Sequence, residues 1–158
     1  MKSSTIEMKR RLISSLPLTR ALIFKPEDSL RKVIEGMQNY AQGAALIVDR
    51  DHLAGIFTER DFLHLCHSQE KPMDTPISQW MTKKTMSLHY NDTLLDALTL
   101  MVERGIRHIP ILESEQFASK ILSARDLIDF FAEQSPSETF DGPLPSLDSF
   151  PSDFLEDE

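Results

Sequence analysis

Two hydroxyl–carboxylate pairs are the residues of this sequence best suited to hold a ligand. Thr58 precedes Asp61 by three residues, and Ser123 precedes Asp126 by the same spacing. At the start of a helix, this spacing points a hydroxyl and a carboxylate at one spot. An ionised carboxylate only accepts hydrogen bonds and can bind both hydroxyls of a ribose, while Ser or Thr can donate or accept. The same pair can instead do no more than cap the helix, and the pattern leaves both roles open.

A basic pair, Arg107 and His108, opens an apolar run that is typical of a buried strand. An arginine guanidinium can bind a phosphate through a forked set of donors. A histidine has an ordinary pKa of about 6.5, so its capacity to donate depends on its charge near neutral pH. The alternative is an arginine that reaches solvent and a histidine at the edge of the core.

Metal or redox chemistry has one candidate segment, which holds His64, Cys66 and His67. The two histidines are three residues apart on a predicted helix, so they share one face. Zinc would need a third or fourth ligand from elsewhere. We therefore expect no metal site and rank metal or redox sensing last among the possible functions.

These residues belong to a sequence that repeats itself at an offset of 64. The segment 28–30 (Asp-Ser-Leu) aligns with 92–94 (Asp-Thr-Leu). With one residue inserted in the second copy, 56–61 aligns with 121–126. We assign the first copy to residues 18–70 and the second to 78–134, with an N-terminal arm (1–17), a linker (71–77) and a C-terminal tail (135–158).

Each copy predicts the order β-α-β-β-α. Asp and Ser or Thr offer a helix N-cap in both copies, and apolar residues recur after them at helical spacing. In the second copy, this stripe comprises Leu94, Leu95, Leu98, Met101 and Val102. The continuous apolar runs 46–48 and 109–112 are typical of strands buried on both faces. One copy is too short to bury both faces alone, so we predict an α/β (α+β) unit of two packed copies, with a pseudo-twofold axis and two related clefts.

The copies resemble CBS (cystathionine-β-synthase) motifs, and the pair resembles the unit called a Bateman module. Residues 55–62 (GIFTERDF) are similar to the family's G-h-h-T-x-x-D ending, and residues 105–111 (GIRHIPI) to its G-h-R-H-h-P-h strand entry. Residues 77–82 (ISQWMT) are similar to the opening of many second motifs. The resemblance covers about 120 of the 158 residues.

The resemblance implies a regulatory module rather than an enzyme. Such a module binds an adenosine-containing ligand (AMP, ADP, ATP, NAD or S-adenosylmethionine) between its motifs and signals to a partner, usually as a homodimer. It implies roles for eight residues: the ribose and its neighbouring phosphate at Thr58, Asp61, Ser123 and Asp126, further phosphate contacts at Arg107 and His108, and a purine pocket lined by the backbone of Lys84 and Thr85.

Two departures from the family pattern predict that the clefts are not equivalent. The first copy has Gly43 and Ala44 where the second has the basic pair. The second copy has Lys120 where the family usually has a glycine that permits a close approach. Two roles are open for Lys120: narrowing the second cleft or reaching a phosphate.

The net charge of −8 is concentrated in the tail. Residues 135–158 hold seven acids and no Lys or Arg, so the rest of the chain is nearly neutral and a nucleic-acid partner is disfavoured. The tail composition predicts disorder. Its scattered hydrophobes leave two possibilities, a solubilising tail or a motif in 136–158 that docks a client protein. The second would make the chain a ligand-independent interaction module.

The remaining composition argues for a cytoplasmic protein without catalysis. We find no run of 18 apolar residues and no secretory signal, and Cys66 is the one cysteine, which fits a reducing compartment. Residues 6–16 predict a short amphipathic helix whose attachment to a membrane would be marginal. Five glycines form no phosphate-binding loop, and no nucleophile–base motif occurs.

Overall fold

The computed structural model describes residues 10–66 and 72–134, and these residues form two halves with the same element order. The first half comprises β1 (Leu22–Phe24), α2 (Leu30–Asn39), β2 (Ala44–Asp49), β3 (His52–Thr58) and α3 (Glu59–Cys66). The second comprises β4 (Leu88–His89), α4 (Leu94–Arg104), β5 (His108–Leu112), β6 (Ala118–Ser123) and α5 (Ala124–Gln134). Short 3₁₀ turns, η1 (Ile13–Ser15) and η2 (Ile77–Gln79), precede the two halves. The predicted β-α-β-β-α repeat is confirmed.

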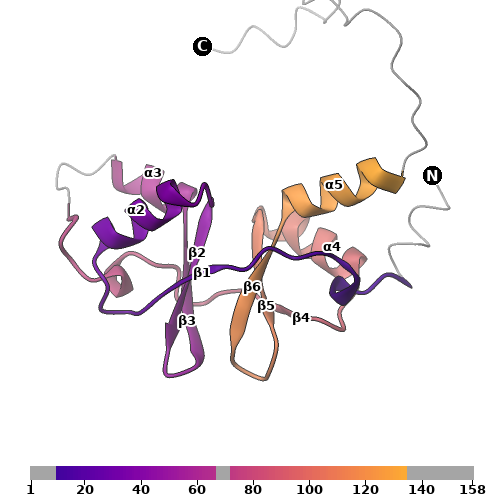
Figure 1. The fold of residues 1–158 in the computed structure, drawn as a ribbon, viewed down its shortest axis with the longest axis horizontal. Helices are drawn as coiled ribbons and strands as arrows, with labels where there is room; N and C mark the ends of the chain where they lie inside the picture. The colour runs from indigo at the N-terminus through magenta and orange to yellow at the C-terminus, as the bar shows by residue number, and fades with distance from the viewer. Residues whose placement is uncertain (1–9, 67–71, 135–158) are drawn as a thin grey trace, which may run out of the picture.

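Each half contains a three-stranded sheet. In the first, β1 runs parallel to β2, and β2 runs antiparallel to β3. In the second, β4, β5 and β6 are arranged in the same way. The hairpins β2–β3 and β5–β6 lie side by side at the centre, with α2 and α3 beside one hairpin and α4 and α5 beside the other (Figure 1).

The central strand β2 is buried on both faces, as its apolar run predicts. Ala45 and Ile47 pack against α2 in the core of the first half. Leu46 and its neighbours on the other face pack against Ala118 and Ile121 of the second half. Successive side chains of a strand point to opposite faces, so one strand joins the core of its own half to the interface between the halves.

The helices α2 and α4 begin where the sequence predicts. The Ser29 side chain accepts from the Lys32 N–H, and Thr93 forms a capping box at the start of α4. The expected apolar stripe of α4 is wrong at Val102, whose side chain is 74% exposed. Val102 directly follows the buried Met101, about 100° further around the helix, and this step turns it away from the core.

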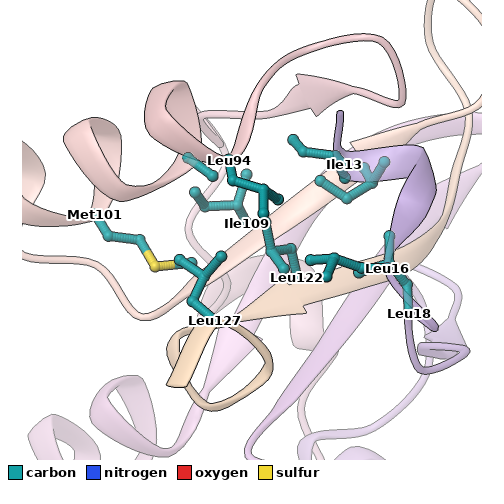
Figure 2. Close-up of a cluster of buried hydrophobic side chains, with 10 residues drawn as sticks. Ile13, Leu16, Leu18, Leu94, Met101, Ile109, Leu122 and Leu127 are labelled. Carbon is teal, nitrogen blue, oxygen red and sulfur yellow. The ribbon is translucent and has the colours of Figure 1, made fainter. Parts of the chain in front are cut away.

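The segment before each half packs on the opposite half. Ile13, Leu16 and Leu18 lie against Leu94 and other residues of the second core (Figure 2). In the same way, Ile77 is buried in the core of the first half. We call these two segments, residues 11–21 and 73–82, the lead-in segments. Their exchange binds the two halves into one unit.

In the described part of residues 6–16, the expected amphipathic helix does not continue past Arg10. The chain is extended at Leu12, where it bridges to Thr93, and then makes the three-residue turn η1. The backbone N–H groups of Ile13 and Ser14 donate to the carbonyls of Asp92 and Tyr90, so they are not available for helical bonds to their own segment. Residues 6–9, and the whole tail 135–158 with its predicted disorder, lie outside the described residues.

Candidate functional site

Both hydroxyl–carboxylate pairs lie where a strand meets a helix. Thr58 ends β3 and Asp61 lies in the first turn of α3, and Ser123 and Asp126 have the same places in β6 and α5. Asp61 Oδ2 accepts from the Thr58 backbone N at 2.8 Å and from Thr58 Oγ1 at 2.7 Å. Asp126 Oδ2 accepts from Ser123 N at 2.6 Å and from Ser123 Oγ at 2.7 Å. One carboxylate oxygen therefore caps the helix, and Oδ1 is not used for the cap.

Capping geometry alone does not mark a ligand site in this protein. Thr93 and Asp96 make the same contacts, with Asp96 Oδ2 at 2.9 Å from Thr93 N and 2.7 Å from Thr93 Oγ1. This third pair lies under the N-terminal lead-in segment, where Leu12 bridges to Thr93. The other two pairs line cavities between the halves. Position distinguishes them, and Thr93–Asp96 becomes a natural control.

The first cleft, which contains Thr58 and Asp61, has a volume of about 290 Å³. Ile56 and Leu63 give it apolar walls, and Thr82 enters from the lead-in segment of the second half. Thr82 Oγ1 lies 3.4 Å from Asp61 Oδ1. The volume is at the lower end of the range for small-molecule sites.

The second cleft, which contains Ser123 and Asp126, is larger, at about 560 Å³. Ile121 forms part of its wall, and the N-terminal lead-in segment adds residues 19–21. Its volume lies well within the range of small-molecule sites. The two clefts are unequal, as the sequence predicts.

Each cleft is completed by the lead-in segment of the other half. Thr82 exchanges two backbone hydrogen bonds with Ile56 of β3, at 2.9 and 3.1 Å. The Ala21 N–H donates to the carbonyl of Ser119 on β6 at 2.9 Å. These bonds hold the segments against the last strand of the opposite sheet. A ligand in either cleft would therefore touch both halves.

The two clefts share one wall, formed by Gly43, Glu59, Arg107 and His108. A Cβ on Gly43 would lie 3.3 Å from Glu59 Oε2 and 3.4 Å from His108 Cε1, so the carboxylate and the imidazole flank the glycine closely. In the repeat, Gly43 aligns with Arg107, and Glu59 aligns with Ala124. The first half thus supplies the acid of this wall, and the second half supplies its bases.

Its surroundings favour the neutral form of the His108 side chain. Burial lowers the pKa of His108 below its ordinary value, and the neighbouring charge of Arg107 lowers it further. Glu59 and Asp126 act in the opposite direction but do not outweigh burial. An anion placed beside His108 would favour the imidazolium, so this side chain can respond to a bound phosphate by taking up a proton.

The structure places Lys84 and Thr85 outside both clefts. Thr82 reaches the first cleft in their stead, because its backbone pairs with Ile56 and the chain then turns away, with Thr85 Oγ1 donating to the Thr82 carbonyl at 3.1 Å. Thr85 lines a separate hollow of about 230 Å³ near the hairpin ends. The side chain of Lys84 is exposed. Neither residue lines a cleft, and the purine-pocket role expected of their backbone stays a prediction.

Lys120 also lies away from the clefts. Its ammonium group is 5.6 Å from the centre of the Tyr90 ring, within range of a cation–π contact. The adjacent Ile121 lines the second cleft, and alternation along β6 turns Lys120 to the opposite face. Lys120 therefore fills neither of the two roles expected of it.

The sequence reasoning missed several residues that line the clefts, among them Arg20, Glu59, Thr82 and Arg125. Glu59 and Arg125 occupy unspecified positions of the Thr/Ser-x-x-Asp pattern, and that proximity was the available signal. Thr82 is the last residue of the segment 77–82, which resembles the opening of many second motifs, but that resemblance did not point to a role in binding. Arg20 carries no motif, since only the pairing of its segment with β6 brings it to the site.

Metal ligands do not gather in the part of the chain that the structure describes. Among residues 10–66 and 72–134, no group of three or more His, Cys, Asp or Glu side chains could hold a metal ion. His64 and Cys66 are exposed on α3, and His67 lies outside the described residues. Within the same described ranges, every helix is too short or too polar to cross a membrane.

Residues 8–68 and 77–133 both match the CBS domain family. The chain therefore belongs to this family, as a tandem pair of CBS motifs that form a Bateman module.

Relatives of similar size share this fold. An uncharacterized 17.7 kDa protein of Acidianus ambivalens is 28% identical over 116 residues, which cover 73% of this chain and 70% of that protein. The CBS domain-containing protein YhcV of Bacillus subtilis is 28% identical over 109 residues, which cover 69% and 77% of the two chains. The crystal structure of an uncharacterized conserved protein from Pyrococcus horikoshii has a TM-score of 0.68 at 27% identity, with coverage of 84% and 98%. The chain spans only 46% of a longer relative from Thermofilum pendens.

Two solved structures with this fold carry adenosine compounds. The protein CBSX2, solved in complex with AMP, matches with a TM-score of 0.69 at 17% identity. The match covers 78% of this chain and 98% of the CBSX2 chain. A CBS domain pair in complex with methylthioadenosine and S-adenosyl-L-methionine has a TM-score of 0.71 and 16% identity, with the same coverage. At these identities the likeness concerns the fold.

Proposed function

We propose that this chain is a regulatory module that binds an adenosine-containing ligand in its two clefts and signals the occupancy to a partner. The observation that carries the proposal is the position of the hydroxyl–carboxylate pairs. Of the three pairs with capping geometry, the two with a place in the family pattern line the two clefts between the halves, and the third lines neither of these clefts. We assign the clefts to binding rather than catalysis.

The ribose is held by the carboxylates. Asp61 and Asp126 use Oδ2 for the helix cap, which fixes the orientation of the carboxylate and turns Oδ1 to the ribose hydroxyls. At Asp61, Oδ1 also accepts from Thr82 Oγ1 at 3.4 Å and can accept a second hydrogen bond. Thr58 and Ser123 stand beside them as donors or acceptors for the ribose or its first phosphate. Because cap and ligand contact share one side chain, ligand binding adds little ordering cost at this point.

Phosphate is received at the shared wall. Arg107 offers a guanidinium to both clefts, and among the described residues it has no ion pair that would compete. His108 is poised to add a second positive charge when an anion arrives. The adenosine class is supported by two proteins of the same fold, one solved with AMP and one with methylthioadenosine and S-adenosyl-L-methionine.

The proposed module acts as a homodimer, the state usual in its family. Val102 on α4 and Ile128 on α5 are 74% and 66% exposed. Both belong to the pair of helices that pack together beside the second sheet. Large apolar side chains exposed on neighbouring helices fit a helix-to-helix contact between two copies.

Thermal unfolding of the full chain with AMP, ADP, ATP, NAD, S-adenosylmethionine and guanosine nucleotides tests the proposal. A ligand at 100 times its Kd adds about 2.7 kcal/mol to the free energy of unfolding. At this chain length, that gain raises Tm by roughly 5–10 °C. We expect such a shift for an adenosine compound and its loss in Asp61→Ala or Asp126→Ala, according to the occupied cleft.

Asp96→Ala is the matched control, because it removes a cap of the same geometry outside the clefts. It lowers the Tm of the free protein but keeps the full ligand-dependent shift. Equal shifts for adenosine and guanosine nucleotides would contradict the adenosine assignment. No shift with any ligand would contradict the sensor role and favour an interaction module that acts through residues 136–158.

A further inference from the structure

The two clefts differ in where their arginines are directed. Arg60 and Arg125 are equivalent in the repeat, each one residue before the ribose-binding aspartate. Arg60 Nη1 donates to the carbonyl of Gly105 at 2.7 Å. Gly105 ends α4, where backbone carbonyls carry partial negative charge. The guanidinium of Arg60 is therefore engaged by the protein itself.

Arg125 has no such anchor. Among the described residues, its one ion pair is with Asp129 at 3.8 Å, and the side chains are 87% and 65% exposed, so the pair is weak. Ala41, the counterpart of Gly105, makes no described hydrogen bond with Arg125. Arg125 lines the second cleft and remains available to an incoming anion.

The lead-in segments add to this difference. Arg20 lines the second cleft, and among the described residues it has no ion pair. Lys83 and Lys84 directly follow the lead-in segment of the first cleft, but neither lysine lines that cleft. The second cleft thus gathers three arginines against two carboxylates, whereas the first has two arginines, of which Arg60 is engaged, against two carboxylates.

The cleft with more arginines is also the larger of the two. The second cleft, at about 560 Å³, has nearly twice the room of the first, at about 290 Å³. Ser123 and Asp126 are half-buried, and Arg20 and Arg125 are exposed at the rim of the same cavity. A ligand with its ribose at Asp126 and its first phosphate at Arg107 would extend further phosphates toward the rim.

We propose that the second cleft selects a nucleoside with two or more phosphates, with Arg20 and Arg125 as the residues that hold the outer phosphates, and that the first cleft takes an adenosine compound with at most one phosphate. This inference rests on the proposed function for the nucleoside part of the ligand. It adds how many phosphates each cleft accepts, and it names Arg20 and Arg125 as the residues that determine this specificity.

Isothermal titration calorimetry of the full chain with adenosine, AMP, ADP, ATP and inorganic tripolyphosphate tests the inference. Each charge-assisted arginine–phosphate contact changes affinity by roughly tenfold. Arg125→Ala and Arg20→Ala should each lower the affinity for ADP and ATP by roughly tenfold, and the affinity for AMP by less than about threefold. Asp126→Asn should abolish ATP binding, and Asp61→Asn should leave it intact.

Arg60→Ala is the matched control, since it removes the equivalent guanidinium from the first cleft, and ATP affinity should stay unchanged. Equal weakening of AMP and ATP in the Arg20 and Arg125 variants, or loss of ATP binding in Asp61→Asn, would overturn the division between the clefts. So would ATP affinity that is independent of both arginines.

Tripolyphosphate separates this inference from the proposed function. Binding of tripolyphosphate that depends on Arg20 and Arg125, without preference for adenosine over guanosine triphosphate, would support the phosphate site and contradict the adenosine assignment. Binding of AMP with no gain from added phosphates would support the proposed function and overturn this inference. Absence of binding by every probe would overturn both.

Discussion

Ile13 and Ile77 occupy equivalent places in opposite halves of the molecule. Both side chains are fully buried, and they lie 64 residues apart, the offset of the repeat. The Ile13 N–H donates to the Asp92 carbonyl at 2.9 Å, and the Ile77 N–H donates to the Asp28 carbonyl at 2.8 Å. Each isoleucine precedes one half in the chain and packs in the core of the other. The same exchange brings residues 19–21 and Thr82 to the clefts.

The exchange predicts that the N-terminal lead-in segment is part of the fold. We expect Ile13→Ala and Ile77→Ala to lower the free energy of unfolding by about 2–5 kcal/mol each, because each leaves a cavity in a packed core. Leu12→Ala is the control in the same segment, since Leu12 is 39% exposed, and its loss should be less than half as large. Urea denaturation measures all three, and a negligible loss in Ile13→Ala would show that the segment is not part of the core.

The close approach at Gly55 predicts a coupling between fold and first cleft. A Cβ on Gly55 would lie 2.7 Å from the Thr82 carbonyl oxygen and 2.8 Å from Met81 Sδ. Gly55→Ala must push the lead-in segment away from β3, so we expect a loss of about 1–3 kcal/mol in stability and weaker binding in the first cleft. Denaturation and calorimetry measure the two effects.

Gly36→Ala is the comparison for Gly55→Ala. Its Cβ would lie 2.6 Å from Phe24 Cζ, the far end of a side chain that can move. Alanine is also favoured over glycine within a helix by about 1 kcal/mol. We therefore expect a smaller loss of stability than for Gly55→Ala and unchanged ligand binding. A larger loss at Gly36 would contradict the special role of the Gly55 contact.

The depressed pKa of His108 predicts a pH dependence of stability. The unfolded chain protonates this histidine at a higher pH than the folded chain does. The contribution of neutral His108 to stability is therefore complete above the unfolded value of about 6.5 and is lost as pH falls toward the folded pKa. Denaturation between pH 5 and 8 should give a shallower acid loss for His108→Gln than for the unmodified chain. An unchanged profile in His108→Gln would refute this assignment.

The same histidine predicts proton uptake when a phosphate binds. A phosphate at the shared wall raises the pKa of His108, so nucleotide affinity should increase as pH falls from about 8 to 6. Calorimetry in two buffers with different ionisation enthalpies measures the protons taken up. Adenosine, which has no phosphate, is the control ligand and should show none. Equal uptake with adenosine and AMP would assign the proton to another group.

The exposed apolar residues on α4 and α5 predict where two copies meet. We expect the double change Val102→Glu with Ile128→Glu to shift the protein from dimer to monomer, because burial of unpaired carboxylates is costly. Sedimentation velocity at micromolar concentration measures the change. Ile23→Glu, on β1 and 41% exposed in the described chain, should leave the dimer intact. If the unmodified chain is monomeric, there is no dimer contact. If dimers survive the double change, the contact lies elsewhere.

The amino-acid sequence by itself determined the repeat, the element order and the paired hydroxyls and carboxylates. These features depend on local physics. Ser29 and Thr93 cap helices through neighbours three residues away, and the apolar run around Leu46 and Ile47 requires a strand with two buried faces whatever lies beyond it. Val102 was wrongly placed in the buried stripe of α4 for a related reason. An apolar residue at the border of such a stripe can face the core or solvent, and its type alone does not decide which.

Only the tertiary structure decided which side chains complete the clefts. Arg20 reaches the second cleft through the pairing of its segment with β6, and Thr82 reaches the first cleft through its bonds to Ile56. Whether Arg60 binds Gly105 or an incoming phosphate depends on a helix end 45 residues away. Such contacts depend on how distant segments pack together, so the pattern of neighbouring residues in the chain does not predict them.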